Sequence, residues 1–137
     1  MCEYTVERTA ANLPQSATHD LFTVSGGRVV VTAVLGEVTT AVQNQANTSF
    51  LKASSTVSGA VESNISTTMA LQDLPVGMLI SGADGPYYNV KPQLAMNPVV
   101  IASGGAVRLS CAASNTGQIK WLLRYYPLDP GAKVTAA

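Results

Sequence analysis

The sequence predicts an all-β protein, a jelly-roll-like antiparallel sandwich in a single domain with an extended N-terminal arm. Roughly eight to ten short segments rich in β-branched and aromatic residues follow one another at regular spacing. Glycine, proline, asparagine and serine separate these segments, as turns require. No long stretch has the period of an amphipathic helix. The chain has 137 residues, enough for one domain with a core. We assign residues 1–18 to an N-terminal arm or edge strand and residues 19–137 to the sandwich domain.

The N-terminal segment alternates between two sets of side chains. Tyr4, Val6 and Arg8 would share one face of a strand over residues 3–9. This segment could form an edge strand or an arm that reaches a neighbour. Residues 10–16 contain Pro14 and predict a loop, because proline removes a donor from a β ladder.

Residues 21–42 form the longest run of β-formers, and Gly26 and Gly27 interrupt it near its start. Two glycines supply the positive φ of a tight turn, so we expect a hairpin here. The predicted faces of its second strand are the set Val29, Val31, Ala33 and Leu35, and the set Val30, Thr32 and Val34. Both sets are largely apolar, which is typical of a strand covered on two sides. The second cover must come from elsewhere in the chain or from another subunit.

The middle of the chain is rich in serine, threonine, asparagine and glutamine. Short strands are expected at residues 50–53 and 67–71. A helix over residues 60–71 is the alternative, which the many serine, threonine and asparagine residues disfavour. Residues 74–80 predict a short buried strand, and residues 87–90 continue the β pattern.

A second hairpin is expected over residues 99–111, turned by Gly104 and Gly105. The clearest strand spans residues 118–126, and the turn at 115–117 predicts that it pairs with residues 106–112. Its two predicted faces are the set Ile119, Trp121, Leu123 and Tyr125, and the set Lys120, Leu122, Arg124 and Tyr126. The tail from residue 131 to 137 is short and made of small residues.

The share of charged residues is low. It is 12%, against about 25% in an ordinary soluble protein, and the net charge is zero. No basic stripe indicates nucleic-acid binding, and no cationic amphipathic segment indicates a membrane surface. Such a surface suits partial burial in an assembly. The alternative is an ordinary β domain whose surface is covered by serine and threonine.

The first residues lack the basic start and apolar core of a signal peptide. Two cysteines are too few for a disulfide scaffold. Cys111 lies in a strand pattern and is expected to be a small buried side chain, whereas Cys2 is near the end of the chain. A bridge between them is not expected.

No motif predicts a reaction. The single histidine, His19, precedes Asp20, but a metal site needs more ligands. A serine-hydrolase elbow, a phosphate-binding glycine loop and paired carboxylates are not found in the sequence. The glycosylation sequons at Asn47 and Asn64 are interpreted as accidents of a polar stretch. We therefore predict no enzyme, no catalytic or metal-binding residue and no cofactor.

Five aromatic residues offer an alternative, a sugar-binding site. Aromatic faces stack on sugar rings, and the residues concerned are Tyr87, Tyr88, Trp121, Tyr125 and Tyr126. The competing interpretation places one tyrosine of each pair in the core and the other on the outer face or at an interface.

Four motifs together resemble a known class of protein. They are Thr9-Ala10-x-x-Leu13-Pro14-Gln15, Leu21-Phe22-Thr23-Val24-Ser25-Gly26-Gly27, Leu35-Gly36-Glu37-Val38-Thr39-Thr40, and Thr116-Gly117-Gln118-Ile119-Lys120-Trp121-x-x-x-Tyr125-x-Pro127-Leu128-Asp129-x-Gly131-Ala132. This set is similar to capsid decoration, or cement, proteins of tailed bacteriophages. The similarity covers most of the chain, with residues 44–98 loosely matched.

The resemblance implies a virion structural protein, made in the cytoplasm of the host bacterium and placed on the capsid surface. It implies a homo-oligomer, commonly a trimer, that binds the outside of the capsid and stabilises contacts between major capsid subunits. Many identical binding sites would make a modest affinity effective. The alternative function is a receptor- or glycan-binding knob of a phage tail or head fibre.

Overall fold

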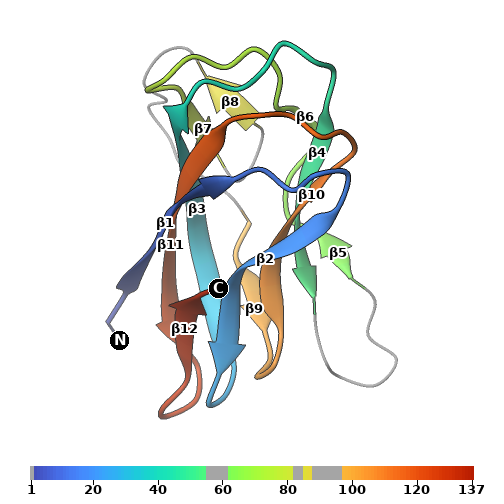
Figure 1. Ribbon diagram of the computed structural model, residues 1–137. Coiled ribbons are helices and arrows are strands. Elements are labelled where there is room, and N and C mark those ends of the chain that lie inside the picture. The colour runs from blue at the N-terminus through green and yellow to red at the C-terminus, as the bar shows by residue number, and fades with distance from the viewer. Residues whose placement is uncertain (1, 55–61, 82–84, 88–96) are drawn as a thin grey trace.

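The protein is a sandwich of two antiparallel sheets (Figure 1). The computed structural model describes residues 2–54, 62–81, 85–87 and 97–137. Within these ranges there are strands, turns and bends but no helix, and thus no helix that could cross a membrane. The predicted all-β class and antiparallel sandwich are confirmed.

Each sheet contains six of the strands that the structure describes. Sheet A has the order β1 (Tyr4–Asn12), β11 (Gln118–Pro127), β3 (Val29–Thr40), β7 (Leu79–Ser81) and β8 (Gly85–Tyr87), and β9 (Val99–Ile101) also pairs with β3. Sheet B has the order β12 (Lys133–Ala136), β2 (Thr18–Ser25), β10 (Ala106–Cys111), β4 (Thr48–Ser54) and β5 (Ser63–Asn64), and β6 (Met69–Ala70) also pairs with β4.

The strand pairs are nested along the chain. β1 pairs with β11, β2 with β10, β3 with β9, and β4 with β5. Strands that follow one another therefore cross between the sheets at several turns. This order places the two ends of the chain on adjacent edges, where Arg8 of β1 donates a hydrogen bond to the Ala137 carbonyl at 3.2 Å.

The predicted hairpins are wrong, although their turn residues are right. Gly26, Gly104 and Gly117 have φ values of 77°, 86° and 130°, as expected for glycine turns. However, these turns join β2 to β3, β9 to β10, and β10 to β11, and each pair of strands lies in different sheets. The strand at 118–126 consequently pairs with β1 and β3 instead of residues 106–112.

The predicted faces of β3 are correct only up to Val31. The pairing with β11 shifts between Tyr125, opposite Val31, and Arg124, opposite Ala33, which leaves Thr32 as an extra residue. Such a β-bulge reverses the alternation of side chains beyond it. The core contains Val29, Val31, Val34 and Val38 from this strand, whereas Ala33 and Leu35 are not part of the core cluster.

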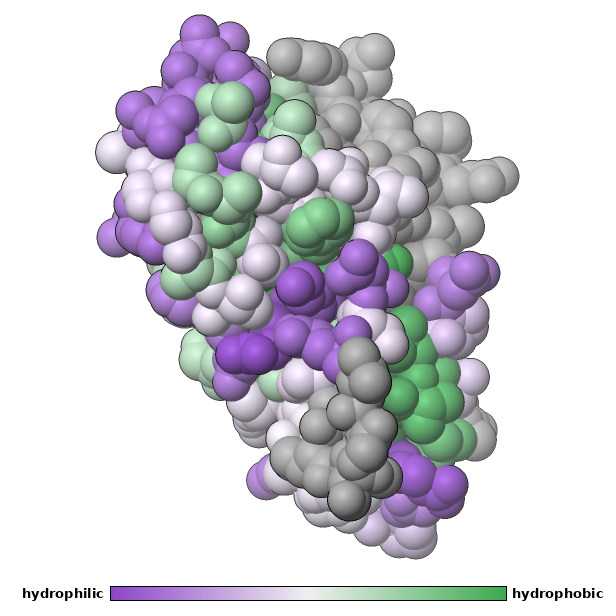
Figure 2. Space-filling model, turned by 90° about the vertical axis from the view of Figure 1, so that its right-hand side faces the viewer, coloured by the Kyte–Doolittle hydropathy of each residue, from purple (hydrophilic) through white to green (hydrophobic). Residues whose placement is uncertain are grey.

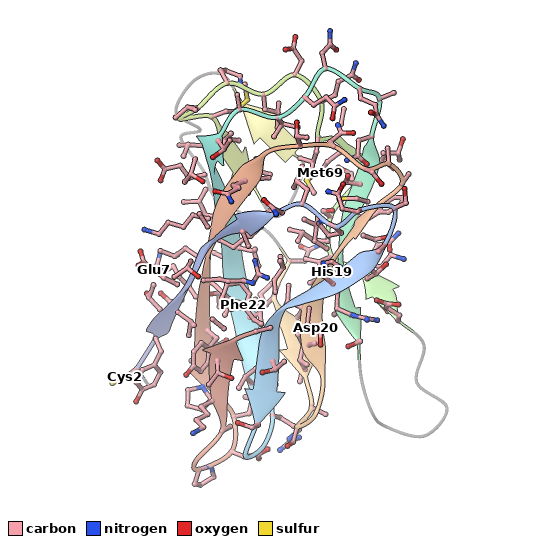
Figure 3. All side chains as sticks on the ribbon, viewed as in Figure 1. Cys2, Glu7, His19, Asp20, Phe22 and Met69 are labelled. Carbon is pink, nitrogen blue, oxygen red and sulfur yellow. The ribbon has the colours of Figure 1, made fainter. Side chains whose placement is uncertain are left out.

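The core lies between the sheets. Its largest fully buried side chains include Trp121, Phe22, Leu51, Leu109 and Leu123. Figure 3 shows Phe22 between the two layers. The prediction that Ile119, Trp121, Leu123 and Tyr125 share one face is confirmed, because all four are buried in the core cluster.

The remaining segments differ in detail from the predictions. Of the two roles expected for the N-terminal segment, the structure describes an edge strand, β1. Residues 62–71 contain β5 and β6, so the helix alternative is wrong there, and residues 60–61 are outside the described residues. Residues 88–90 are also outside the described residues. The short tail forms β12 and pairs with β2.

Candidate functional site

The histidine and aspartate at positions 19 and 20 do not form a metal site. His19 is exposed on β2, and the Asp20 carboxylate accepts a hydrogen bond from Arg108 Nε at 2.8 Å. Across the described residues, no three histidine, cysteine, aspartate or glutamate side chains gather so that they could hold a metal ion. Asp20 is thus an ion-pair partner of Arg108.

The aromatic residues considered for sugar binding are divided between the core and the surface. Trp121 is 1% exposed and Tyr125 is 6% exposed, so neither ring can stack on a sugar. Tyr126 is half-buried on β11, Tyr87 lies in β8, and Tyr88 is outside the described residues. This distribution removes two of the five aromatic rings from the proposed sugar site.

The two cysteines are free, with Cys2 exposed and Cys111 buried. The prediction that Cys111 is a small buried side chain is confirmed. Its burial raises the pKa of the thiol above the ordinary value, although Ser49 donates a hydrogen bond to Sγ at 3.5 Å. A protonated, buried thiol is inert, so Cys111 has a packing role. Of the sequon residues, Asn47 is buried and Asn64 is exposed on β5.

The outer face of sheet B is polar, and oppositely charged side chains on it pair with one another. Arg108 lies 2.8 Å from Asp20 Oδ1 and 3.6 Å from Glu62 Oε1. Lys52 Nζ is 5.8 Å from the centroid of the Phe50 ring. Figure 2 shows hydrophilic residues across the middle of this side of the molecule. Such paired charges are typical of a solvated surface.

The outer face of sheet A has a different character. Leu122 of β11 lies opposite Leu35 of β3 in the ladder. Tyr126, Val30 and Val100 form a second apolar row across β11, β3 and β9, and Val100 is 59% exposed. Among the described residues, these rows make the outer face of sheet A more apolar than that of sheet B.

Ion pairs border the apolar rows of sheet A. Lys120 Nζ lies 3.4 Å from Glu7 Oε1, and Arg124 lies 2.5 Å from Glu3 Oε1. Figure 3 shows Glu7 projecting from β1 on the side away from the sandwich interior. The charged side chains therefore lie near β1 and β11, beside the leucines.

The chain itself supplies part of the second cover that β3 requires. Val30 and Ala33 belong to the outer side of the strand, yet they are only 6% and 7% exposed. Leu35 is half-buried. A neighbouring subunit is thus not needed for Val30 or Ala33, and the uncovered apolar surface is at Leu35, Leu122 and Val100.

A shallow hollow of about 80 Å³ lies on this face. Its lining residues are Glu7, Leu35, Gly36, Glu37, Leu79, Lys120 and Leu122. Small-molecule sites usually enclose about 300–1,000 Å³, so this hollow is too small for a metabolite. Its size suits one side chain of another protein.

An ion pair between Arg28 and Asp129, called the clasp below, joins the loops that follow β2 and β11. Arg28 Nε and Nη2 donate to the two carboxylate oxygens of Asp129 at 3.0 and 2.9 Å, and the Arg28 backbone N–H donates at 2.8 Å. These hydrogen bonds lower the pKa of Asp129 from 3.8 to about 2.

The clasp predicts an acid-dependent loss of stability. Because the pKa of Asp129 is lower in the folded protein, its carboxylate stabilises the fold above pH 3.8, and this contribution disappears as the pH falls toward 2. Between pH 4.5 and pH 2, the urea concentration at the midpoint of unfolding should therefore fall less for Asp129→Asn than for wild type. Glu37→Gln, which removes a carboxyl outside any ion pair of the described chain, is the control. The prediction fails if Asp129→Asn follows the wild-type curve.

The sequence pattern identified only part of the face on sheet A. Leu122 and Tyr126 were visible as apolar residues among Lys120 and Arg124. The pattern places Leu35 on the same face as Val29 and Val31, because the bulge at Thr32 leaves no mark in the sequence. Nothing in the sequence indicates that Leu79 joins them, since only the pairing of β7 with β3 brings it there.

Comparison with known proteins assigns the chain to no family. The chain matches no protein-family model, no curated protein and no solved structure.

Proposed function

We propose that this protein is a virion structural protein that binds the outside of a phage capsid as a homo-oligomer and stabilises contacts between major capsid subunits. Its partner is the major capsid protein, and its place is the capsid surface. The proposal does not involve an enzymatic reaction, a nucleic acid or a membrane.

The observation that carries this proposal is the apolar outer face of sheet A. Leu35, Leu79 and Leu122 lie half-buried around a hollow, and Val100 is more than half exposed. Partly exposed aliphatic side chains bordered by ion pairs are typical of a protein–protein interface. A face of this kind favours binding to another protein surface over binding a metabolite.

The strand order supports the same proposal. We interpret the nested pairing of early with late strands as jelly-roll-like. Jelly rolls form viral capsid domains, lectins and cupins. The cupin option requires several histidine ligands and the sequence has one histidine. A lectin-type sugar site could not use Trp121 and Tyr125 for stacking, because both rings are buried.

Co-sedimentation with capsids that lack the protein tests the proposal. The protein is expected to pellet with such capsids, to saturate at a fixed ratio to the major capsid protein, and to raise the temperature at which the capsids break open. Light scattering on the free protein should give the mass of an oligomer, for which the resemblance implies a trimer. A monomer that stays in the supernatant would overturn the proposal, and binding on a glycan array would instead support the knob function.

A further inference from the structure

We propose that the hollow on sheet A is a socket for one basic side chain, arginine above all, from a partner protein. This inference names the contact chemistry of the function proposed above and rests on it for the identity of the partner. The socket itself is defined by the residues of this chain.

The floor of the hollow is apolar. Leu35 and Leu122 lie opposite each other in the β3–β11 ladder, and Leu79 of β7 lies opposite Glu37 of β3. All three leucines are half-buried. Gly36 lies between Leu35 and Glu37 and presents only backbone, because a Cβ on it would point at the Trp121 ring, 2.9 Å from Cζ3. The floor thus has methyl groups at its sides and no side chain in its middle.

The rim carries an excess of negative charge. Glu7 and Lys120 pair at 3.4 Å, with 57% and 40% of their side chains exposed. Glu37 is exposed, and it takes part in none of the ion pairs formed among the described residues. Two carboxylates and one ammonium group therefore surround the leucines, which leaves one negative charge unbalanced.

An arginine satisfies both parts of this arrangement. Its methylene stem can lie on the leucines while its guanidinium group reaches the carboxylate of Glu37. Guanidinium groups bind carboxylates through two parallel hydrogen bonds and lose less hydration energy than ammonium groups. A volume of about 80 Å³ holds roughly two or three water molecules, the scale of one side-chain end. An acidic side chain would be repelled by the carboxylate of Glu37. A purely apolar side chain would leave this carboxylate without a partner.

A titration with a small probe tests the socket without a capsid. The probe is N-acetyl-arginine methylamide, and its neutral counterpart is the citrulline analogue, which has nearly the same shape. In methyl NMR spectra, the arginine probe is expected to shift the signals of Leu35, Leu79 and Leu122 several-fold more than the citrulline probe does. Glu37→Gln should remove this difference, and Glu62→Gln on sheet B should preserve it. Equal shifts with both probes would overturn the socket.

Capsid binding separates this inference from the proposed function. Glu37→Lys is expected to weaken binding to capsids by roughly tenfold or more, whereas Glu62→Lys, with the same charge change on the other sheet, should bind like wild type. If wild type and Glu37→Lys bind equally well, the socket is wrong and the proposed function stands. If wild type ignores capsids but the arginine probe binds selectively, the proposed function is wrong and the socket stands.

Discussion

Replacing Trp121 with alanine is expected to lower the free energy of unfolding by about 3–5 kcal/mol. Trp121 is 1% exposed and is the largest of the fully buried side chains. Its ring lies against Gly36, so close that a Cβ there would come within 2.9 Å of Cζ3. The strands around it are fixed by backbone pairing on both sides of β11, so they cannot collapse into the space. The loss combines reduced apolar burial with a residual cavity.

Urea denaturation followed by far-UV circular dichroism measures this loss, because the variant has no tryptophan whose fluorescence could report unfolding. Leu122→Ala is the matched control, because Leu122 is the next residue of the same strand and is half-buried on the outer face. It should lose clearly less stability than Trp121→Ala. Equal losses would mean that the inner and outer faces of β11 are not as described.

Asn115→Ala is expected to lower the free energy of unfolding by about 1–3 kcal/mol. The Asn115 side chain is fully buried, and its Nδ2 donates to the carbonyls of Gln45 at 2.8 Å and Leu71 at 3.0 Å. It thereby ties together three segments at one end of the sandwich. Removal of the amide takes a donor from both carbonyls, and the loss is costly at the Leu71 carbonyl, whose hydrogen bond is buried away from water.

The isosteric change Asn115→Asp distinguishes hydrogen bonding from packing. The aspartate has the same shape, but it places an oxygen against the two carbonyl oxygens. It should destabilise the protein at least as much as alanine, as measured by thermal unfolding at neutral pH. Asn64→Ala, at an exposed position of β5, should stay within about 0.5 kcal/mol of wild type. A stable Asn115→Asp protein would contradict the assigned hydrogen bonds.

The sequence predicted where most strands lie but not how they pair. Glycine at 26, 104 and 117 fixes the turns, because few other residues accept their positive φ. A turn between two β segments does not say whether the segments pair side by side or separate into two layers. That choice depends on partners far along the chain, such as β1 with β11, which local patterns do not reveal.

The candidate site could be predicted only in part, because it too depends on how distant strands pair. The alternation in residues 118–126 identified the faces of β11 because the pairing there remains regular from Ile119 to Arg124. On β3, one extra residue at Thr32 moved Leu35 to the outer face, next to Leu122. Among the described residues Glu37 takes part in no ion pair, and this depends on its neighbours in space, which only the assembled sheet defines.

The nested pairing also determines when the protein can fold during synthesis. β1 ends at Asn12, but its ladder partner begins at Gln118, so β1 remains unpaired until the ribosome has synthesised β11. β3 likewise lacks its longest pairing until the ribosome has passed β11. The hollow, whose walls come from β1, β3, β7 and β11, therefore forms only after β11 has been made. A nascent chain stalled before β11 would expose unpaired strands, which makes it a substrate for chaperones.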